Sequence, residues 1–417
     1  MRNFKFLLLC LSTINTINQC AGKSPSSSKG SSSKGSGSSE GGGGGRYGGG
    51  GGYSYGGGRS YTSNYYYYYY YSHHHSGSDP QEGDSPIPPL PAPTDQDKID
   101  AADIVNAQFD EKVIGSKLPF REPINRQVIN HEIAVYNHGD RLIKEKYLPN
   151  HKKNPPFKDL CFALVNDPVT VLTMFLGEFL HRKDETFIII VLTLCQDRST
   201  MHYIYDHTHK NHLNKRRRKQ RHPFANLMKV WIDRDRDPEG SAFTPQDIQK
   251  DVDSMKNEYP HWKKTRDSIE NTLIKKCYNF SLSVVQEFEA DLKITIEEAI
   301  SQKIKNHDLV DAYTSLAMYV KDKYNYMATT LQKYCDGKDR WAVWIMMIGS
   351  TDPADWPKID VAFKKINKNV SLKDHILKVT ENEADRIPFE MMAAVIDPTY
   401  KPSYMGGGGI STQEKPN

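Results

Sequence analysis

The segment HRKDETFIIIVLTLC, residues 181–195, places charged side chains directly before a run of aliphatic and β-branched residues. This run is too short to span a membrane, which takes about 20 apolar residues. It is also too apolar for a helix face that meets water. Since β-branched residues favour strands, the segment alone permits either a strand or a buried helix.

The same stretch occurs twice in the chain. FLGEFLHRKDETFIIIVL, residues 175–192, aligns without a gap with TLQKYCDGKDRWAVWIMM, residues 330–347, after a shift of 155 residues. Leu176 then falls on Leu331, and Lys183-Asp184 falls on Lys338-Asp339. Each copy has a helix-like lead, a short charged turn and a hydrophobic segment, so the segment belongs to a repeated unit.

A second element recurs four times. FKDLCFALVNDP, from Phe157, returns as IPFEMMAAVIDP, from Ile387, and more loosely from Phe224 and Leu309. A period near 75 residues is too long for one helical hairpin and predicts four supersecondary units, each with room for about five helices. From about residue 97 to 400, apolar residues recur at helical spacing and glycines are few, which predicts an all-α core. The β-branched run is then a helix buried on all sides.

This arrangement resembles the annexin core. Residues 125–148, followed by FKDLCFALVNDP, look like the second, third and last helices of a first annexin repeat. Residues 326–366 look like the opening of a fourth repeat, and residues 284–300 like the middle of a third. The third repeat matches least well, because its expected first helix, TRDSIENTLIKKC from Thr265, is polar.

The resemblance implies an all-α fold of four annexin-like repeats, each of about five helices, that form a curved core behind a disordered head. The predicted divisions are a signal peptide (1–21), a Gly/Ser/Tyr/Pro-rich head (22–96), repeats 1 to 4 (97–168, 169–240, 241–322 and 323–400) and a flexible tail (401–417).

The N-terminus reads as a secretory signal. Arg2 and Lys5 precede the apolar residues 6–11, and cleavage is expected near residues 20–22. We therefore expect an extracellular, soluble protein. Four cysteines remain, Cys161, Cys195, Cys277 and Cys335, enough for one or two disulfides whose pairing the sequence leaves open. Two sequons make Asn279 and Asn369 candidate glycosylation sites.

The head is of low complexity and has almost no aliphatic residue before Ile87, so it cannot bury a core that offsets its chain entropy. Seven consecutive tyrosines, Tyr65 to Tyr71, suit oxidative cross-linking in a matrix or weak self-association. A repeat tract without a selected role is the alternative.

The annexin resemblance implies calcium-dependent binding to anionic phospholipid. The family loop K-G-x-G-T-D/E lies between the first two helices of a repeat, and a carboxylate about 40 residues later completes the calcium shell. Residues with a Cβ resist the backbone angles that such a loop needs. The corresponding loops here, residues 106–110, 180–184 and 335–339, keep one glycine between them, and repeat 3 has no recognisable loop.

We therefore expect high-affinity calcium binding to be lost, so that no cofactor is required, although Ca²⁺ stays a candidate. The carboxylates left at the loop positions are Asp110, Asp184, Glu185, Asp339 and Glu381. Arg182, Lys183 and Lys338 would repel a cation at the same positions.

A basic run, KRRRKQR, interrupts the second repeat. Its cations are Lys215, Arg216, Arg217, Arg218, Lys219 and Arg221. They could hold an anionic phospholipid surface in place of calcium, or a sulfated glycan. A nuclear localisation signal, a protease site and a solvated loop are the alternatives. Nearby, His202, Asp206 and His209 share one helix face, which suits a transition metal or a polar helix surface.

The chain carries no catalytic motif that we recognise, so a non-enzyme is expected. A formal net charge of +4 does not indicate nucleic-acid binding. The favoured function is attachment to anionic lipid or glycan surfaces outside the cell. The alternatives are a structural matrix or coat protein that assembles through the core and the Tyr-rich head, and an effector delivered to a host cell.

Overall fold

The computed structural model describes residues 90–136, 155–208, 213, 223–233, 235–335, 340–381, 383 and 386–405. All of them lie in the second of the chain's two units, residues 57–417. The predicted signal peptide, the Tyr-rich part of the head, Asp339, His209 and the whole basic run lie outside the described residues. The described residues form helices and contain no strand, which confirms the all-α prediction.

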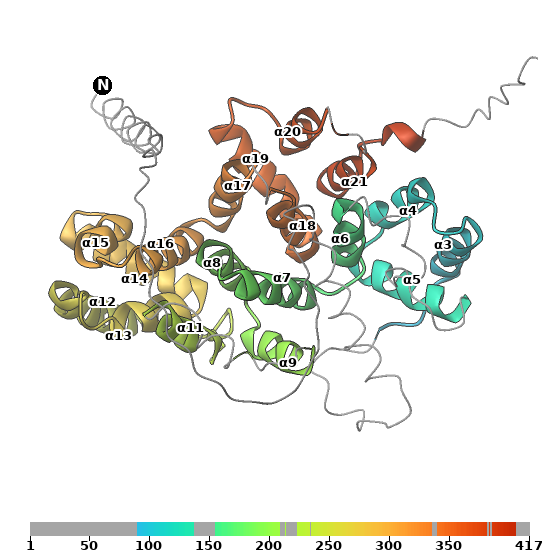
Figure 1. Cartoon of the computed structure of the whole chain (residues 1–417). Helices are drawn as coiled ribbons and strands as arrows, with labels where there is room; N and C mark the ends of the chain where they lie inside the picture. Colours follow the sequence, from blue (N-terminus) through green and yellow to red (C-terminus); the bar gives the residue numbers. More distant parts are fainter. Residues whose placement is uncertain are drawn as a thin grey trace, which may run out of the picture. The chain divides into compact units, whose positions relative to one another are not determined.

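The first two groups of helices cover the N-terminal half of the core (Figure 1). The first group comprises α3 (Asp95–Asn106), α4 (Glu111–Lys117), the 3₁₀ turn η1 (Leu118–Phe120), α5 (Pro123–Tyr136) and α6 (Pro155–Leu164). The second comprises α7 (Pro168–Arg182), α8 (Glu185–Leu194), α9 (Arg198–Thr208) and α11 (Phe224–Ile232). Helix α3 begins two residues before the predicted core because the side chain of Thr94 caps it in a capping box.

The other two groups follow in the C-terminal half. The third comprises α12 (Pro245–Glu258), η3 (Tyr259–His261), α13 (Asp267–Glu270), the π-helical turn η4 (Asn271–Lys275), α14 (Tyr278–Leu292), α15 (Ile296–Lys303) and α16 (His307–Lys321). The fourth comprises α17 (Lys323–Lys333), α18 (Arg340–Ser350), η5 (Pro353–Asp355), α19 (Trp356–Ile366), α20 (Leu372–Val379), α21 (Ile387–Ile396) and η6 (Ser403–Met405).

Helix α8 is the apolar run of the first paragraph. Its residues Phe187 to Thr193 are all buried, and it packs against α7 and α16. Burial on every side overrides the strand propensity of its β-branched residues. Helices α7 and α17 begin 155 residues apart, and so do α8 and α18, so the sequence shift pairs structurally equivalent helices.

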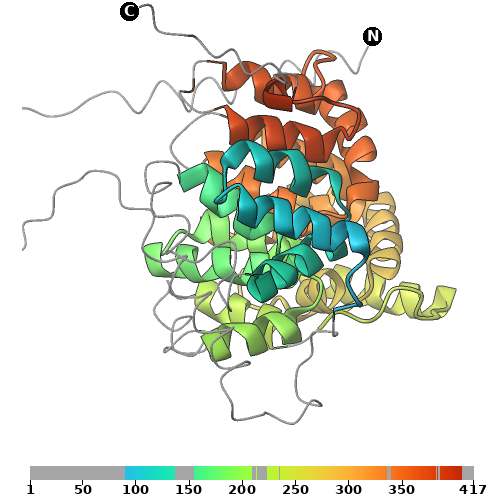
Figure 2. The same ribbon diagram turned by 90° about the vertical axis from the view of Figure 1, so that its right-hand side faces the viewer.

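The last group packs against the first. Helix α18 lies beside α6, and α21 contacts α4 and η1 (Figure 1). Figure 2 shows the red C-terminal helices next to the cyan N-terminal ones. The predicted tail is wrong in its first residues, because Ser403 bonds to the buried carboxylate of Glu390 and the Tyr404 hydroxyl donates to the Gly115 carbonyl at 3.1 Å. Residues 406–417 lie outside the described residues.

Two predicted helix positions are wrong. The first helix of the third group is α12, and the polar segment from Thr265 forms α13 and η4 instead. The reason is that α12 is mostly polar and buries only Val252 and Met255, so few apolar residues mark it as a core helix. In the first group, α3 and α4 precede α5, so α5 is the third helix rather than the second.

Of the four cysteines of the core, Cys161, Cys195 and Cys277 are free and buried, and Cys335 is partly exposed. Among the described residues, no helix combines the length and the apolar character needed to cross a bilayer.

Candidate functional site

The loop between α3 and α4, Ala107–Asp110, is the first position at which the resemblance places calcium. Asp110 caps α4: its Oδ1 accepts from the N–H groups of Lys112 and Val113 at 2.9 and 3.3 Å. Phe109 is turned into the core and is 4 % exposed. The carboxylate predicted as a calcium remnant therefore stabilises a helix end.

Glycine is not required for the backbone of these loops. Gln108 and Phe109 have φ of 53° and 63°, and Lys183 in the next loop has φ of 57°. The expectation that residues with a Cβ would resist such angles is wrong here, since the surrounding packing holds three of them in the left-handed region. The capacity of a loop to bind calcium must therefore be judged by its oxygen ligands.

The loop between α7 and α8 is reduced to Lys183 and Asp184. Residues 180–182, predicted to belong to it, are the last turn of α7. The N–H groups of Lys183 and Asp184 both bond to the Phe179 carbonyl, and the Arg182 guanidinium lies 3.6 Å from the Asp184 carboxylate. Glu185 follows in the first turn of α8 and is half-buried. A cation at Asp184 would have to compete with Arg182.

The third group does have such a loop, residues 259–266, although the sequence analysis found none. Two aromatic side chains anchor it. Trp262 is fully buried and stacks on Phe288 with ring centroids 5.6 Å apart. Tyr259 meets the Trp262 ring edge-on at 5.2 Å. The loop is therefore held in place from its inner side.

The carbonyl groups of this loop bind its own donors. The carbonyl of Tyr259 accepts from the Trp262 N–H, and that of His261 accepts from two following N–H groups. Arg266 donates through Nη1 to the carbonyls of Trp262 and Lys263, at 3.2 and 3.4 Å. Calcium in a loop needs several converging carbonyls, and the carbonyls of Trp262 and Lys263 already accept from the guanidinium.

Glu258 ties the start of α13 to the end of α12. Its carboxylate accepts from the N–H groups of Asp267 and Ser268, at 3.0 and 2.7 Å, and from the Ser268 hydroxyl. Burial by itself raises the pKa of Glu258, but these hydrogen bonds outweigh it and lower the pKa below its usual range. The charged form of Glu258 thus stabilises the loop.

This lowered pKa predicts acid sensitivity. Since the folded state holds the Glu258 proton more weakly than the unfolded state, its contribution is full above the unfolded pKa and is lost as the pH falls through the folded pKa. In that acidic range, we expect the thermal unfolding midpoint of Glu258→Gln to fall less steeply with decreasing pH than that of the wild type. Thermal unfolding against pH tests this, and a wild-type slope in the variant would contradict it.

The fourth loop is described only at Tyr334 and Cys335. Asp339 lies outside the described residues, and Glu381 is exposed just after α20. Over the described ranges, no three His, Cys, Asp or Glu side chains gather so as to hold a metal ion. Of the five predicted calcium remnants, the structure thus places four, each in a different setting.

The remaining sequence candidates fall on separate surfaces. His202 Nε2 lies 3.5 Å from Asp206 Oδ2, and Asp206 also accepts from the Leu213 N–H at 2.6 Å. Asn279, on α14, and Asn369, after α19, are both exposed. Lys215, Arg216, Arg217, Arg218, Lys219 and Arg221 lie outside the described residues.

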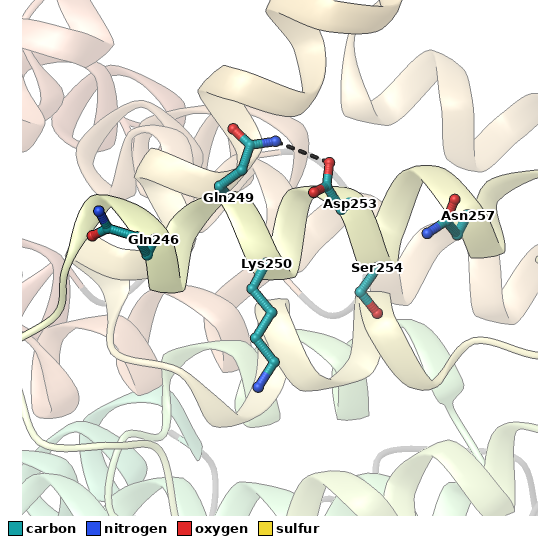
Figure 3. A pocket seen from close by; sticks show the side chains of 6 residues that line it. All are labelled: Gln246, Gln249, Lys250, Asp253, Ser254 and Asn257. Carbon is teal, nitrogen blue, oxygen red and sulfur yellow. Dashed lines mark hydrogen bonds between the residues drawn. The ribbon is translucent and has the colours of Figure 1, made fainter.

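A hollow on α12 does not form an enclosed binding site. Its volume is about 610 Å³, and Figure 3 shows that its labelled side chains all project from this one helix. They are Gln246, Gln249, Lys250, Asp253, Ser254 and Asn257. Gln249 donates to Asp253 at 2.9 Å, and no second element supplies a facing polar group to the lining.

Solved structures share this helix arrangement. Chicken annexin V in complex with Zn²⁺ matches with a TM-score of 0.59 and 18% identity, over 74% of this chain and 97% of that one. Annexin III matches with a TM-score of 0.62 and 18% identity, over 74% and 96%. The chain has an annexin-like fold. Calcium-bound annexin (Sm)1 matches this annexin-like chain with a TM-score of 0.61 and 14% identity, over 74% and 93%.

Comparisons by sequence find no counterpart. No family model matches the annexin-like chain, and no curated protein matches it either.

Sequence reasoning missed the loop of the third repeat because it placed the first helix too late. A signal for the true start was present: Thr244, Pro245 and Asp247 form a capping box with proline in the first turn. Starting the helix there would have put its end at Glu258 and the loop directly after it.

Proposed function

We propose that this annexin-like protein attaches to anionic phospholipid membrane surfaces, outside the cell that makes it, and that it does so without calcium and without catalysis. The observation that carries this proposal is the loop of residues 259–266, where the Arg266 guanidinium donates to the carbonyls of Trp262 and Lys263. The annexin-like fold supports the membrane as the target, and the signal-like N-terminus supports secretion.

Basic residues supply the attraction in this proposal. Near an anionic leaflet, each Lys or Arg contributes about 1 kcal/mol, and salt screens this attraction. The run of six cations from Lys215 to Arg221 would contribute where it can approach the lipid. A sulfated glycan presents similar charge and is the competing partner, and self-association through the Tyr-rich head is compatible with either.

Sedimentation of the full chain with phosphatidylserine vesicles tests the proposal. We expect pelleting both with calcium and with a chelator, reversed by high salt. Phosphatidylcholine vesicles are the control. Pelleting only with calcium would overturn calcium independence, and no pelleting in either condition would overturn membrane attachment.

Calcium is also expected to leave the stability of the chain unchanged. A ligand that binds only the folded state raises the unfolding midpoint as its concentration rises above its Kd. Because Asp110 caps α4, Asp184 faces Arg182 and Arg266 fills the third loop, we expect no such rise. Thermal unfolding with and without millimolar calcium measures this change. A clear upward shift of the unfolding midpoint would show that a loop still binds calcium.

A further inference from the structure

Two neighbouring loops of the third repeat are basic and contain no acidic residue. The first is residues 259–266, between α12 and α13, and the second is residues 302–306, which are the last two residues of α15 and the short loop before α16. Their cations are Lys263, Lys264, Arg266, Lys303 and Lys305, together with His261. Neither loop contains a carboxylate that would neutralise these positive charges.

The two loops form one surface. The Tyr259 hydroxyl donates to Gln302 Oε1 at 3.1 Å, which joins the first loop to the start of the second. Lys303 Nζ lies 4.6 Å from the centre of the Tyr259 ring, a cation–π contact. Helix α15 also packs against η3. The cations of the two loops are therefore held near each other by side-chain contacts.

The inner and outer sides of this surface differ. Trp262 is fully buried and Arg266 donates to the loop carbonyls, so both side chains are directed inward. His261, Lys263, Lys264 and Lys305 are exposed. Within the part of the chain that the structure describes, none of these three lysines forms an ion pair. Their charges are thus available to a partner.

The two carboxylates that flank the first loop in sequence form no ion pair with these lysines among the described residues. Glu258, directly before the first loop, bonds to the N–H groups of Asp267 and Ser268. Asp267, directly after it, is exposed at the start of α13. Because the aromatic anchors fix the loop before any partner arrives, little ordering entropy is lost on binding.

We propose that these two loops form a metal-independent docking surface for the phosphate headgroups of an anionic membrane. Arg266 holds the loop through its bonds to the loop carbonyls, while Lys263, Lys264 and Lys305 contact the phosphates. The exposed lysines are spread over two loops, which fits a plane of phosphates rather than one small anion. This inference rests on the proposed membrane attachment and names the residues that make it.

The test compares two triple variants of the full chain in the presence of a chelator. Lys263→Gln, Lys264→Gln and Lys305→Gln together remove the loop charges. Lys98→Gln, Lys365→Gln and Lys401→Gln, at other exposed lysines, remove the same charge elsewhere. With about 1 kcal/mol per lysine, the loop triple should bind phosphatidylserine vesicles about 100-fold more weakly, whereas the control triple should change binding only slightly. All six side chains are exposed or solvent-facing, so the thermal midpoints should stay equal.

The outcomes separate the two proposals. If the wild type does not bind vesicles, membrane attachment itself fails. If the wild type binds and the loop triple binds equally well, or if both triples weaken equally, this docking surface is overturned while attachment stands. Loss of heparin binding without loss of vesicle binding in the loop triple would also overturn it, in favour of a glycan. Protection of residues 259–266 and 302–306 from amide exchange on vesicles would support it independently.

Discussion

Arg236→Ala is expected to lower the free energy of unfolding by about 3 kcal/mol, because the carbonyls of Leu273 and Lys276 lose the guanidinium as a donor. Arg236 is 8 % exposed. It donates to the Lys276 carbonyl at 2.5 Å and to the Leu273 carbonyl, and its guanidinium lies 4.0 Å from the centre of the Tyr278 ring. Burial lowers the pKa of Arg236, which reflects the cost of holding a charge there.

The carbonyl groups at the end of η4 explain why Arg236 contributes to stability. The π-helical turn η4 ends with four consecutive carbonyls, and each finds a donor from outside its own repeat. Arg236 donates to the carbonyls of Leu273 and Lys276. Arg198 donates to the Ile274 carbonyl at 2.9 Å, and the Asp237 N–H donates to the Lys275 carbonyl at 2.6 Å. Helix ends leave such carbonyls without a partner inside the helix. Donors from the second repeat and from the linker after it therefore pair the carbonyls of the third repeat.

Chemical denaturation of Arg236→Ala and Arg236→Lys measures this effect. Lysine keeps the charge but lacks the planar fork that reaches two carbonyls, so we expect it to recover only part of the lost stability. Lys229→Ala, on the exposed face of α11, serves as the control and should change little. If Arg236→Ala were as stable as the wild type, the bonds to η4 would make no net contribution to the free energy of unfolding.

Gly349→Ala is expected to destabilise the contact between the fourth and first repeats by about 1–3 kcal/mol. A Cβ at residue 349 would lie 2.7 Å from the Ala163 Cβ and 2.8 Å from the Ala163 carbonyl oxygen. Helices α18 and α6 would have to move apart, because a backbone oxygen cannot rotate away as a flexible side chain can. The intrinsic helix preference of alanine, about 1 kcal/mol, acts in the opposite direction.

The neighbouring Ser350→Ala provides a control on the same helix, and we expect it to leave the unfolding midpoint nearly unchanged. Double substitution of Gly349→Ala with Ala163→Gly should recover part of the loss, because it removes the Cβ that the new side chain meets. A midpoint for Gly349→Ala equal to or above that of the wild type would show that the helices accommodate the methyl group without strain.

Much of the fold was predictable from local pattern. The 155-residue shift paired α7 with α17 and α8 with α18, and all four copies of the second element are helices. The prediction failed at α12, where burial is confined to a few positions. Repeated apolar residues show which side of a helix is buried, and a mostly polar helix such as α12 offers few of them.

The candidate site was less predictable. The sequence showed that glycines are missing from the loops, and the inference drawn from their absence was that the backbone would resist the required angles and that high-affinity calcium binding would be lost. The structure has Gln108, Phe109 and Lys183 with positive φ, so the turns form without glycine. The altered chemistry lies instead in the oxygen atoms, which bind Arg266 and helix N–H groups.

The repeats and most of their helices could be determined from the sequence, because helical periodicity is a property of short segments and the repeated pattern resolved α8 as a buried helix. Contacts between distant segments were decided only by the tertiary structure. Arg236 meets carbonyls about 40 residues away, and Tyr404 bonds to Gly115 across 289 residues. Within one loop, Trp262 stacks on Phe288 of α14 while the carbonyls of Trp262 and Lys263 accept from Arg266. Such contacts follow from how the helices assemble, and no local pattern records them.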